Sequence, residues 1–393
     1  MAKLSVENLD LAGKKVLMRV DFNVPMDKQG NITDDTRIVA SLQTIKYCIE
    51  KGAKVILMSH LGRPDGKIVD SMSLKPVATR LSELLGKKVL KTNDCIGDEV
   101  EKTTSAMKNG DVVLLENLRF HPEEENNDEK FSKNLANLGD VYVNDAFGTA
   151  HRAHASTVGV TRYLKSAAGF LLKKEIDVLS KVLENPDKPF VAILGGAKVS
   201  TKIGVIENLL PKVSFLLIGG AMAYTFLKAI GEETGNSLVE NDKIGLAKDI
   251  FLGDAEGKIH LPLDHIVARE VSMGAQTEIT KERSIPKGLI GVDIGPRTLI
   301  EYKQIISKAG MVLWNGPMGV FEIDAFATGT VEIARFLAES SAKTIVGGGD
   351  SISALAKAGV TDKIFHVSTG GGASLEFLEG ITLPGIAALG VRS

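Results

Sequence analysis

Cysteine is scarce in this chain of 393 residues, which contains only Cys48 and Cys95. The two form no CxxC motif and cannot build a disulfide framework, so we expect two reduced thiols, as is usual in the cytoplasm. Long apolar runs are missing too, since none approaches the roughly 18 residues of a membrane-spanning helix. Residues 1–15 contain no apolar segment of a secretory signal. The sequence therefore predicts a cytoplasmic protein without a membrane partner.

An excess of charge of either sign is also absent. The chain has 47 Lys and Arg against 49 Asp and Glu, for a net charge of -2. A protein that binds nucleic acid through a broadly basic surface is therefore not expected. Hydrophobic residues make up 44%, which gives enough apolar surface for folding and excludes a disordered chain. At roughly 100–200 residues per domain, the length predicts two or three domains.

Several catalytic motifs are missing. The chain has no GxxxxGK[ST] segment, so it is not a P-loop protein. No GxGxxG follows a strand pattern, which argues against a nicotinamide-dependent dehydrogenase, and there is no GxSxG or HExxH segment. A ligand site must be sought in other patterns.

Short runs rich in Val, Ile and Leu recur along the chain, separated by amphipathic stretches such as 37–50 and 331–339. Several of these runs are apolar throughout, which is typical of strands buried on both faces of a parallel sheet. They cover residues 15–20, 54–58, 111–115, 140–143, 190–194, 213–218, 310–314, 343–346 and 364–367. The alternation predicts an α/β fold of parallel sheets flanked by helices, of the Rossmann-like kind.

A domain boundary is expected near the middle of the chain. Residues 168–184 form one long helical pattern, and Pro186 and Pro189 follow it in a stretch that stops a helix. We therefore predict two similar-sized α/β domains with a cleft between them. The first covers residues 1–170, a connecting helix covers 171–184, and the second domain covers 185–379.

Arginines gather at predicted strand ends in the first half. Arg19, Arg63, Arg119 and Arg152 lie at or just past four such ends, and Arg37 opens the first helix. Ligands of open parallel sheets bind outside the carboxyl ends of the strands, and the planar guanidinium suits carboxylate and phosphate. A surface ion pair is the commoner role of any single arginine. Four together predict a small, multiply anionic substrate, with His60 as a further donor.

Glycines gather at predicted strand ends in the second half. Four strands end in the pairs or triplets 195–196, 219–220, 347–349 and 370–372. Glycine lets the backbone approach a ligand, and helix N-termini offer N–H groups to phosphate. Close packing of strand on helix explains one such loop equally well, but four together predict a nucleotide site. Lys198 and Lys202 are four apart, so on a helix they would share one face.

Two acidic residues are candidates beside these loops. Asp350 follows the triple glycine and is placed to bind a Mg²⁺ that bridges phosphates. Its alternative role is a helix N-cap. Glu322 could bind a ribose hydroxyl, or it is merely an acid in a loop.

Nine segments, in order over almost the whole chain, together resemble the phosphoglycerate kinase family. They are RVDFNVP (19–25), DDTRI (34–38), SHLGRP (59–64), ENLRF (116–120), VNDAFGTAHRAHAS (143–156), GGAKVSTK (195–202), WNGPMGVFE (314–322), GGGDS (347–351) and STGGGAS (368–374). The resemblance implies reversible transfer of the acyl phosphate of 1,3-bisphosphoglycerate to ADP, giving 3-phosphoglycerate and ATP in glycolysis.

The resemblance also implies roles for individual residues. Phosphoglycerate would be bound by Asp21, Phe22, Asn23, Arg37, His60, Leu61, Gly62, Arg63, Arg119 and Arg152. Nucleotide would be bound by Gly196, Lys202, Gly219, Gly220, Gly291, Asn315, Pro317, Glu322, Gly348, Gly349, Asp350 and Ser351. The migrating phosphoryl group would be stabilised by Arg37, Lys198, Gly371 and Gly372. Mg²⁺, bound as Mg-ATP or Mg-ADP, would be held by Asp350.

The resemblance also implies a C-terminal segment, 380–393, that packs on the first domain. We further expect a monomer without a nucleic-acid partner. Hinge closure over the substrates is expected because the two sites lie on different domains. The chain departs from the family pattern at Thr201, where many members have Asp, and at Ser351, where many have Thr. The chemistry is consistent with the absence of an evident His–Asp dyad. Both possible nucleophiles, a carboxylate and an ADP phosphate oxygen, are ionised at pH 7, so no general base is required.

Two other functions remain open on the residues alone. One is a dehydrogenase on a similar two-domain frame, which should bind NADH. The other is a two-lobed solute-binding protein, which should bind the anion without turning over ATP.

Overall fold

Parallel β-sheets form the centres of two units in the computed structural model, which describes residues 3–391. The first unit comprises residues 3–177 and 382–391, and the second comprises Val178–Ile381. Helix α6 (Phe170–Glu184) crosses the boundary between them. The expectation of a two-domain α/β fold is confirmed.

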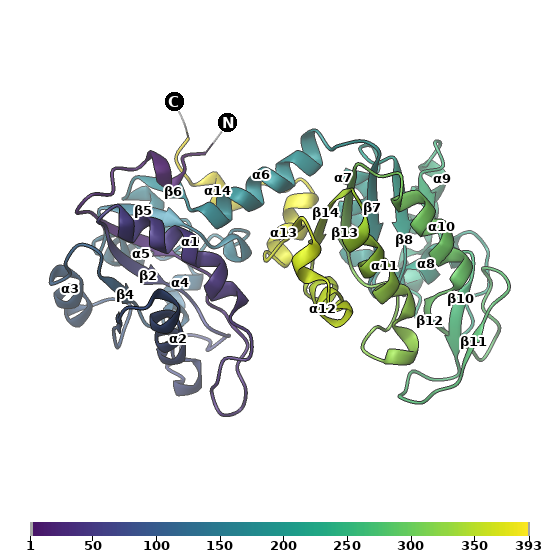
Figure 1. Ribbon diagram of the computed structural model, residues 1–393, viewed down its shortest axis with the longest axis horizontal. Coiled ribbons are helices and arrows are strands. Elements are labelled where there is room, and N and C mark those ends of the chain that lie inside the picture. Colours follow the sequence, from purple (N-terminus) through teal and green to yellow (C-terminus); the bar gives the residue numbers. More distant parts are fainter. Residues whose placement is uncertain (1–2, 392–393) are drawn as a thin grey trace. The chain divides into compact units, whose positions relative to one another are not determined.

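The first unit has a six-stranded sheet in the order β3-β4-β2-β1-β5-β6, with every neighbouring pair parallel. Figure 1 shows helices on either side of it. The strands are β1 (Lys15–Arg19), β2 (Lys54–Met58), β3 (Val89–Lys91), β4 (Val112–Leu114), β5 (Val141–Asn144) and β6 (Ser166–Ala168). The helices are α1 (Thr36–Glu50), α2 (Lys75–Leu85), α3 (Asp98–Ser105), α4 (Pro122–Glu125), α5 (Glu129–Ala136) and α14 (Pro384–Ala387).

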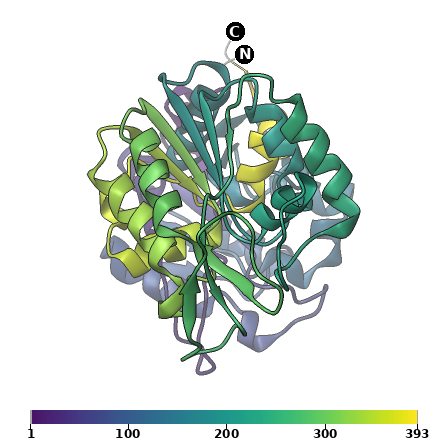
Figure 2. The ribbon, with the colours of Figure 1, turned by 90° about the vertical axis from the view of Figure 1, so that its right-hand side faces the viewer.

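The second unit repeats this plan with the order β15-β14-β13-β7-β8-β9, again parallel throughout. Figure 2 shows helices on both faces of this sheet. The strands are β7 (Phe190–Leu194), β8 (Phe215–Ile218), β9 (Ile259–His260), β13 (Met311–Asn315), β14 (Lys343–Gly347) and β15 (His366–Val367). The helices are α7 (Ile203–Leu209), α8 (Met222–Ala229), α9 (Ile244–Gly253), α10 (Pro296–Ile306), α11 (Thr328–Glu339), α12 (Gly349–Ala358) and α13 (Gly372–Leu378).

The central strands are buried on both faces, as their apolar sequences predict. All five residues of β7 and of β13 are buried, and the large side chain of Trp314 in β13 is fully enclosed. Burial of such side chains contributes roughly 1.5–3 kcal/mol each. These strands therefore anchor the loops that follow their carboxyl ends.

A third sheet, which is antiparallel and belongs to the second unit, departs from the expected plan. Strands β10 (His265–Ala268), β11 (Thr277–Ile279) and β12 (Ile290–Ile294) pair in the order β11-β10-β12. Three strands of the parallel sheets, β3, β6 and β9, were not expected either. Each has only two or three residues and lies at an edge, where pairing with one neighbour creates a strand without a long apolar run.

The end of the described chain pairs with its beginning in the first unit. Lys3 and Val391 form an antiparallel bridge, and the Leu4 N–H donates to the Gly390 carbonyl at 2.9 Å. Ser5 forms a parallel bridge to Ala168, so the beginning of the described chain lies along β6. No helix of the described residues is long and apolar enough to cross a membrane.

Candidate active site

The first candidate cluster lies where the strand order of the first sheet reverses. Strand β1 pairs with β2 on one side and with β5 on the other. In open α/β sheets, ligands bind outside the carboxyl ends of the strands at such a reversal. The segment that follows β1 carries Asp21 and Asn23, and the segment that follows β2 carries His60 and Gly62.

Asp21 and Asn23 organise this cluster through hydrogen bonds. The Arg37 guanidinium, in the first turn of α1, donates to the Asp21 carboxylate at 2.7 Å. The Asn23 side-chain carbonyl accepts from the Gly62 N–H at 2.9 Å. Gly62 has a φ of +65°, and a Cβ there would lie 2.9 Å from the Met72 sulfur, so glycine is required. The structure thus brings these predicted residues together.

His60 is held as a neutral donor. Its Nδ1 lies 3.2 Å from an Arg19 Nη, and because a guanidinium can only donate, Nδ1 must be the acceptor. Nε2 therefore carries the ring proton. Burial, and then the positive charges of Arg19, Arg119, Arg37 and Arg152, lower the pKa of His60 well below its usual value.

The remaining predicted residues of this cluster differ in burial. Arg119 is buried, donates to the Gly62 carbonyl at 2.9 Å and pairs with Glu125 at 3.1 Å. Arg152 is half-buried, with Nε 3.2 Å from a ring nitrogen of His151. Arg63 is exposed, and its side chain makes no hydrogen bond or ion pair with another described residue.

Two apolar members of the predicted set have packing roles. Phe22 is fully buried, and Leu61 is 4% exposed. Leu61 donates its N–H to the Asn117 side chain at 3.2 Å, and the Asn117 amide donates back to the Leu61 carbonyl at 2.8 Å. They contribute backbone and shape to the cluster rather than charge.

The sequence reasoning missed a buried network behind the arginines. Arg19 is fully buried and donates to the Ser156 hydroxyl at 2.8 Å, and Ser156 donates to the fully buried Glu124 at 2.5 Å. Burial raises the pKa of Glu124, although Arg19 and its hydrogen bonds with Ser156 oppose the rise. Arg19 was noticed as a strand-end arginine, but only the fold places it behind His60.

The second candidate site is a pocket of about 310 Å³ in the second unit. It also lies where strand order reverses, because β7 pairs with β8 on one side and with β13 on the other. Loops from the carboxyl ends of β7, β13 and β14 and the start of α13 form its walls. The lining residues are Gly195, Gly196, Ala197, Thr201, Lys202, Asn315, Gly316, Gly348, Gly349, Asp350, Ser351, Gly371, Gly372 and Leu375.

Lys202 is the buried cation of this pocket. Its ammonium donates to the Asn315 side-chain carbonyl, and the Asn315 amide donates to the Gly347 carbonyl at 2.9 Å. Burial lowers the pKa of Lys202 to about 8, although Asp350 and Glu379 oppose the shift. Glu379 is an acidic neighbour that the sequence reasoning missed.

The expected helical face shared by Lys198 and Lys202 is wrong. Residues Val199–Thr201 form a single 3-10 turn, and α7 begins only at Ile203. Lys198 is consequently exposed and lies outside the residues that line the pocket, whereas Lys202 is buried in it.

Several of the predicted glycines pack against one another. A Cβ on Gly195 would lie 2.1 Å from the Pro317 carbonyl oxygen, and one on Gly220 would lie 2.6 Å from the Gly196 backbone. A Cβ on Gly219 would likewise lie 2.5 Å from the Met318 sulfur. These residues join three loops, which the Gly196 N–H to Pro317 carbonyl bond of 3.0 Å also links.

Gly291 lies outside the pocket. A Cβ there would meet the Tyr224 hydroxyl at 2.3 Å, and its N–H donates to Ser237 at 2.9 Å. Gly196, Gly349 and Gly371, by contrast, have open space where a Cβ would be. Those three leave room for a ligand.

The acidic candidates have separate positions. The N-cap of α12 is Gly348, so the alternative role of Asp350 as the cap is wrong; Asp350 is exposed in the first helical turn and lines the pocket. Ser351 accepts the Gly316 N–H at 2.6 Å and joins two walls of the pocket. Glu322 is exposed and is not among the lining residues.

Two parallel sheets, one with an arginine cluster at its switch point and the other with a glycine-rich pocket and a buried lysine, are the arrangement expected of a two-domain α/β kinase. A family model described as "Phosphoglycerate kinase" matches residues 6–381. The chain belongs to the phosphoglycerate kinase family.

Individual relatives agree with this membership. Phosphoglycerate kinase of Chlorobium limicola is 58% identical over 99% of this chain and 100% of its own length. The enzyme of Moorella thermoacetica is 57% identical over 99% of both chains. The solved structure of phosphoglycerate kinase from Coxiella burnetii has a TM-score of 0.90 and 46% identity, and it covers 98% of both chains.

Proposed function

We propose that the two units divide the substrates of the phosphoglycerate kinase reaction. The reaction is the reversible transfer of the acyl phosphate of 1,3-bisphosphoglycerate to ADP, which yields 3-phosphoglycerate and ATP in glycolysis. The first unit binds phosphoglycerate at the cluster around His60, and the second binds nucleotide in the pocket around Lys202. The observation that carries this proposal is the cluster beside His60, in which Arg37 donates to Asp21 at 2.7 Å and Arg119 donates to the Gly62 carbonyl at 2.9 Å.

The phosphoglycerate site is built to bind a small anion. Arg63 and Arg152 offer guanidinium groups that are not committed to a buried carboxylate, and a charge-assisted hydrogen bond contributes roughly 1.5–3 kcal/mol. The Nε2–H of neutral His60 adds a donor without adding a charge. Asp21 pairs with Arg37 at 2.7 Å and so holds that guanidinium within the cluster.

The nucleotide site is built to bind phosphates. The backbone of Gly196, Gly349 and Gly371 has open space beside it, so phosphate oxygens can approach closely. Lys202 supplies the positive charge inside the pocket. Gly219, Gly220 and Pro317 support these loops from behind. We propose that Glu322 contacts the ribose, as the family resemblance implies.

The pocket fits a magnesium ion that accompanies the nucleotide. The Asp350 carboxylate is exposed on the pocket wall and is not used as a helix cap. Magnesium usually takes one or two protein carboxylates together with phosphate oxygens and water, so Asp350 would hold it. When bound, the ion neutralises charge on the phosphates of ATP or ADP.

The transfer itself requires positioning and charge stabilisation. Toward ATP consumption, the ionised carboxylate of 3-phosphoglycerate attacks the γ-phosphorus in line, and the bond to the bridging oxygen of ADP breaks. No proton needs to be removed from the nucleophile. We assign stabilisation of the migrating phosphoryl group to Arg37 and Lys198 and to the N–H groups of Gly371 and Gly372.

The division of substrates is tested by titration calorimetry on two variants. Lys202→Ala should weaken ATP binding and spare 3-phosphoglycerate, while Arg63→Ala should weaken 3-phosphoglycerate binding by roughly 10–100-fold and spare ATP. In each variant, the affinity for the other ligand should stay within twofold of the affinity that the unchanged protein shows. If Lys202→Ala lost 3-phosphoglycerate affinity and kept ATP, the assignment of the units would be reversed.

We also propose that the units close over the two substrates, which excludes water from the transfer. A compact globule of this length has a radius of gyration of ~21 Å. Small-angle scattering should give a larger value without ligands and the largest contraction with both substrates and Mg²⁺. A radius already at the compact value and unchanged by ligands would overturn closure.

We propose that the enzyme acts as a cytoplasmic monomer. The thiols of Cys48 and Cys95 are both free, which suits a reducing compartment. Sedimentation of the purified protein at several concentrations tests the monomer, and cell fractionation tests the compartment.

A further inference from the structure

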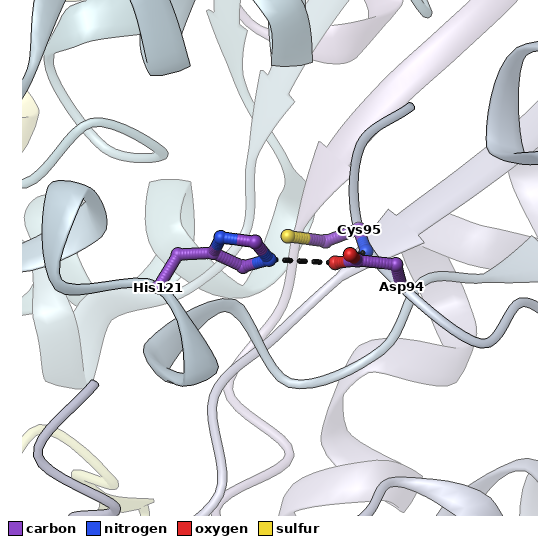
Figure 3. Close-up of side chains that lie close together, drawn as sticks. All are labelled: Asp94, Cys95 and His121. Atoms are coloured by element: carbon purple, nitrogen blue, oxygen red, sulfur yellow. Dashed lines mark hydrogen bonds and ion pairs between the residues drawn. The ribbon is translucent and has the colours of Figure 1, made fainter. Parts of the chain in front are cut away.

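Three side chains with different donor atoms meet in the first unit, and none of them is among the residues assigned to either substrate. Asp94 and Cys95 lie in the segment between β3 and α3, and His121 lies between Phe120 and α4. The Cys95 sulfur, a His121 ring nitrogen and an Asp94 carboxylate oxygen all lie within 4.8 Å of one another. Figure 3 shows the three side chains directed toward a common point.

The surrounding backbone holds these donors in place. The Cys95 N–H donates to the Asp94 carboxylate at 2.6 Å, and the Thr92 hydroxyl donates to the Asp94 carbonyl at 2.6 Å. The His121 ring packs against Phe131, with ring centroids 5.3 Å apart. His121 N–H donates to the Leu118 carbonyl at 3.2 Å. These contacts already restrict the three side chains, so a bound ligand would have to immobilise few further groups.

The cluster has a buried side and an open side. Cys95 is fully buried, while the side chains of His121 and Asp94 are 27% and 49% exposed. His121 Nε2 and Asp94 Oδ1 lie 2.6 Å apart, so these two groups form an ion pair or hydrogen bond that a cation would replace.

The set of donor atoms selects the kind of cation. Thiolate and imidazole suit borderline-soft metals such as Zn²⁺, whereas Mg²⁺ and Ca²⁺ prefer oxygen. Zinc sites with three protein ligands keep a fourth position for water, and the exposed side of this cluster provides one. Tetrahedral ligands of zinc stand about 3.5 Å apart, given Zn–S of about 2.3 Å and Zn–N of about 2.0 Å. The present spacing of up to 4.8 Å needs a contraction of roughly 1.3 Å at most, while His121 Nε2 and Asp94 Oδ1, which are 2.6 Å apart, must separate.

We propose that Asp94, Cys95 and His121 form a zinc site with one open coordination position. On binding, the thiol proton of Cys95 passes to solvent, and the ring nitrogen of His121 binds the metal in its neutral form. The site is separate from the magnesium position at Asp350, which lies in the second unit. His121 is two residues from Arg119 in the sequence, so the metal would sit at the base of a substrate-binding segment.

The experiment is a metal titration of the chelator-stripped full chain. Co²⁺ is the spectroscopic probe, because a thiolate ligand gives a near-ultraviolet charge-transfer band. Zn²⁺ affinity is then measured by competition with a chromophoric chelator. We expect one equivalent to bind with a thiolate band. Cys95→Ser should abolish the band, and Cys95→Ser and His121→Gln should each lower Zn²⁺ affinity by more than the roughly 10–100-fold typical of losing a residue that supports a ligand.

Two control variants separate this site from the alternatives. Cys48→Ser removes the other buried thiol, in α1, and should leave both the band and the affinity unchanged. Asp350→Asn should also leave them unchanged, so failure of the proposed nucleotide site would not affect this result. Circular dichroism confirms that each variant is folded. Absence of the Co²⁺ band in the unchanged protein, or equal loss in Cys48→Ser, would overturn the proposal, as would wild-type zinc affinity in a folded His121→Gln variant.

Discussion

An Nη atom of Arg19 lies 3.2 Å from Nδ1 of His60, and this contact fixes which ring nitrogen carries the proton. The guanidinium donates to Nδ1, so Nε2–H is left as the donor. The pKa of His60 lies well below its usual value, first because the ring is buried and then because of the positive charges of nearby arginines, Arg19 foremost. The ring therefore donates a hydrogen bond at any pH near neutrality.

The first prediction concerns the titration of this ring. The His60 imidazole signals in a proton NMR titration should not move between pH 5.5 and 8, whereas a surface histidine titrates near pH 6.5. His60→Gln keeps an N–H donor at a similar reach, so its KM for 3-phosphoglycerate should rise less than that of His60→Ala. Titration of His60 near pH 6.5 would contradict the assigned neutral state.

The second prediction concerns Arg37. If this guanidinium stabilises the migrating phosphoryl group, Arg37→Ala should lose roughly 10²–10³-fold in kcat. Arg80→Ala is the matched control, because Arg80 on α2 also pairs with an aspartate, Asp35, but lies outside both sites. The measurement is kcat from steady-state kinetics on the two folded variants. Equal kcat values in the two variants would remove Arg37 from the catalytic set.

The third prediction follows from the pKa of Lys202, which burial lowers to about 8. Phosphate binding favours the protonated lysine, so ATP affinity of the free enzyme should fall as the pH rises through 8. Lys202→Met should bind ATP roughly 10–100-fold more weakly, and that residual affinity should be flat across this pH range. Isothermal calorimetry at pH 7, 8 and 9 measures both effects.

Lys202→Met should at the same time raise the stability of the unliganded protein. The native state takes up fewer protons than the unfolded chain between pH 8 and 10.5, so the charged lysine opposes folding below that window. Removing it should raise the free energy of unfolding by at most roughly 3 kcal/mol at pH 7. Lys198→Met, an exposed change, should leave the melting temperature unaltered; a lower melting temperature for Lys202→Met would contradict this account.

The fourth prediction concerns Asp145, which caps the start of α6. Its carboxylate accepts from the Leu171 and Leu172 N–H groups at 2.9 and 3.2 Å, and burial raises its pKa to about 7. The folded state then binds more protons than the unfolded chain between pH 3.8 and 7, so stability should fall as the pH rises through that window.

Asp145→Asn keeps an acceptor for the helix and removes the buried charge. We compare the free energy of unfolding of this variant with that of the unchanged protein. The difference should favour the variant more at pH 8 than at pH 5, by roughly 1–4 kcal/mol. Urea unfolding at the two pH values is the measurement. Asp128→Asn, at the less buried cap of α5, is the control. The same difference in that variant would show that loss of a cap, rather than a buried charge, is responsible.

The sequence predicts the parts of the fold that depend on local pattern. Runs such as Phe190–Leu194 are apolar at every position, and such a run can only be buried on both faces. Strand β6, Ser166–Ala168, has no β-branched or aromatic residue and exists because β5 pairs with it. A strand that depends on its neighbour is invisible until the neighbour is placed.

The same distinction applies to the site. Motif residues such as Asp21, Asn23 and Lys202 could be named from the sequence because the segments that contain them resemble the phosphoglycerate kinase family. Arg19 could not be assigned behind His60, because its position depends on the pairing of β1 with β2. Cys95 and His121 are similarly 26 positions apart and match no spacing motif.

The bridge between Lys3 and Val391 has a consequence for synthesis on the ribosome. The second unit is one continuous stretch of chain, so it can fold as soon as it emerges. The first unit begins earlier but receives residues 382–391 last, and Gly385 donates to Ala150 at 2.8 Å in that final segment. Synthesis of the first unit therefore begins before that of the second unit but is completed after it. Cutting the chain shortly before Thr382 should leave the second unit intact and the first without its final segment.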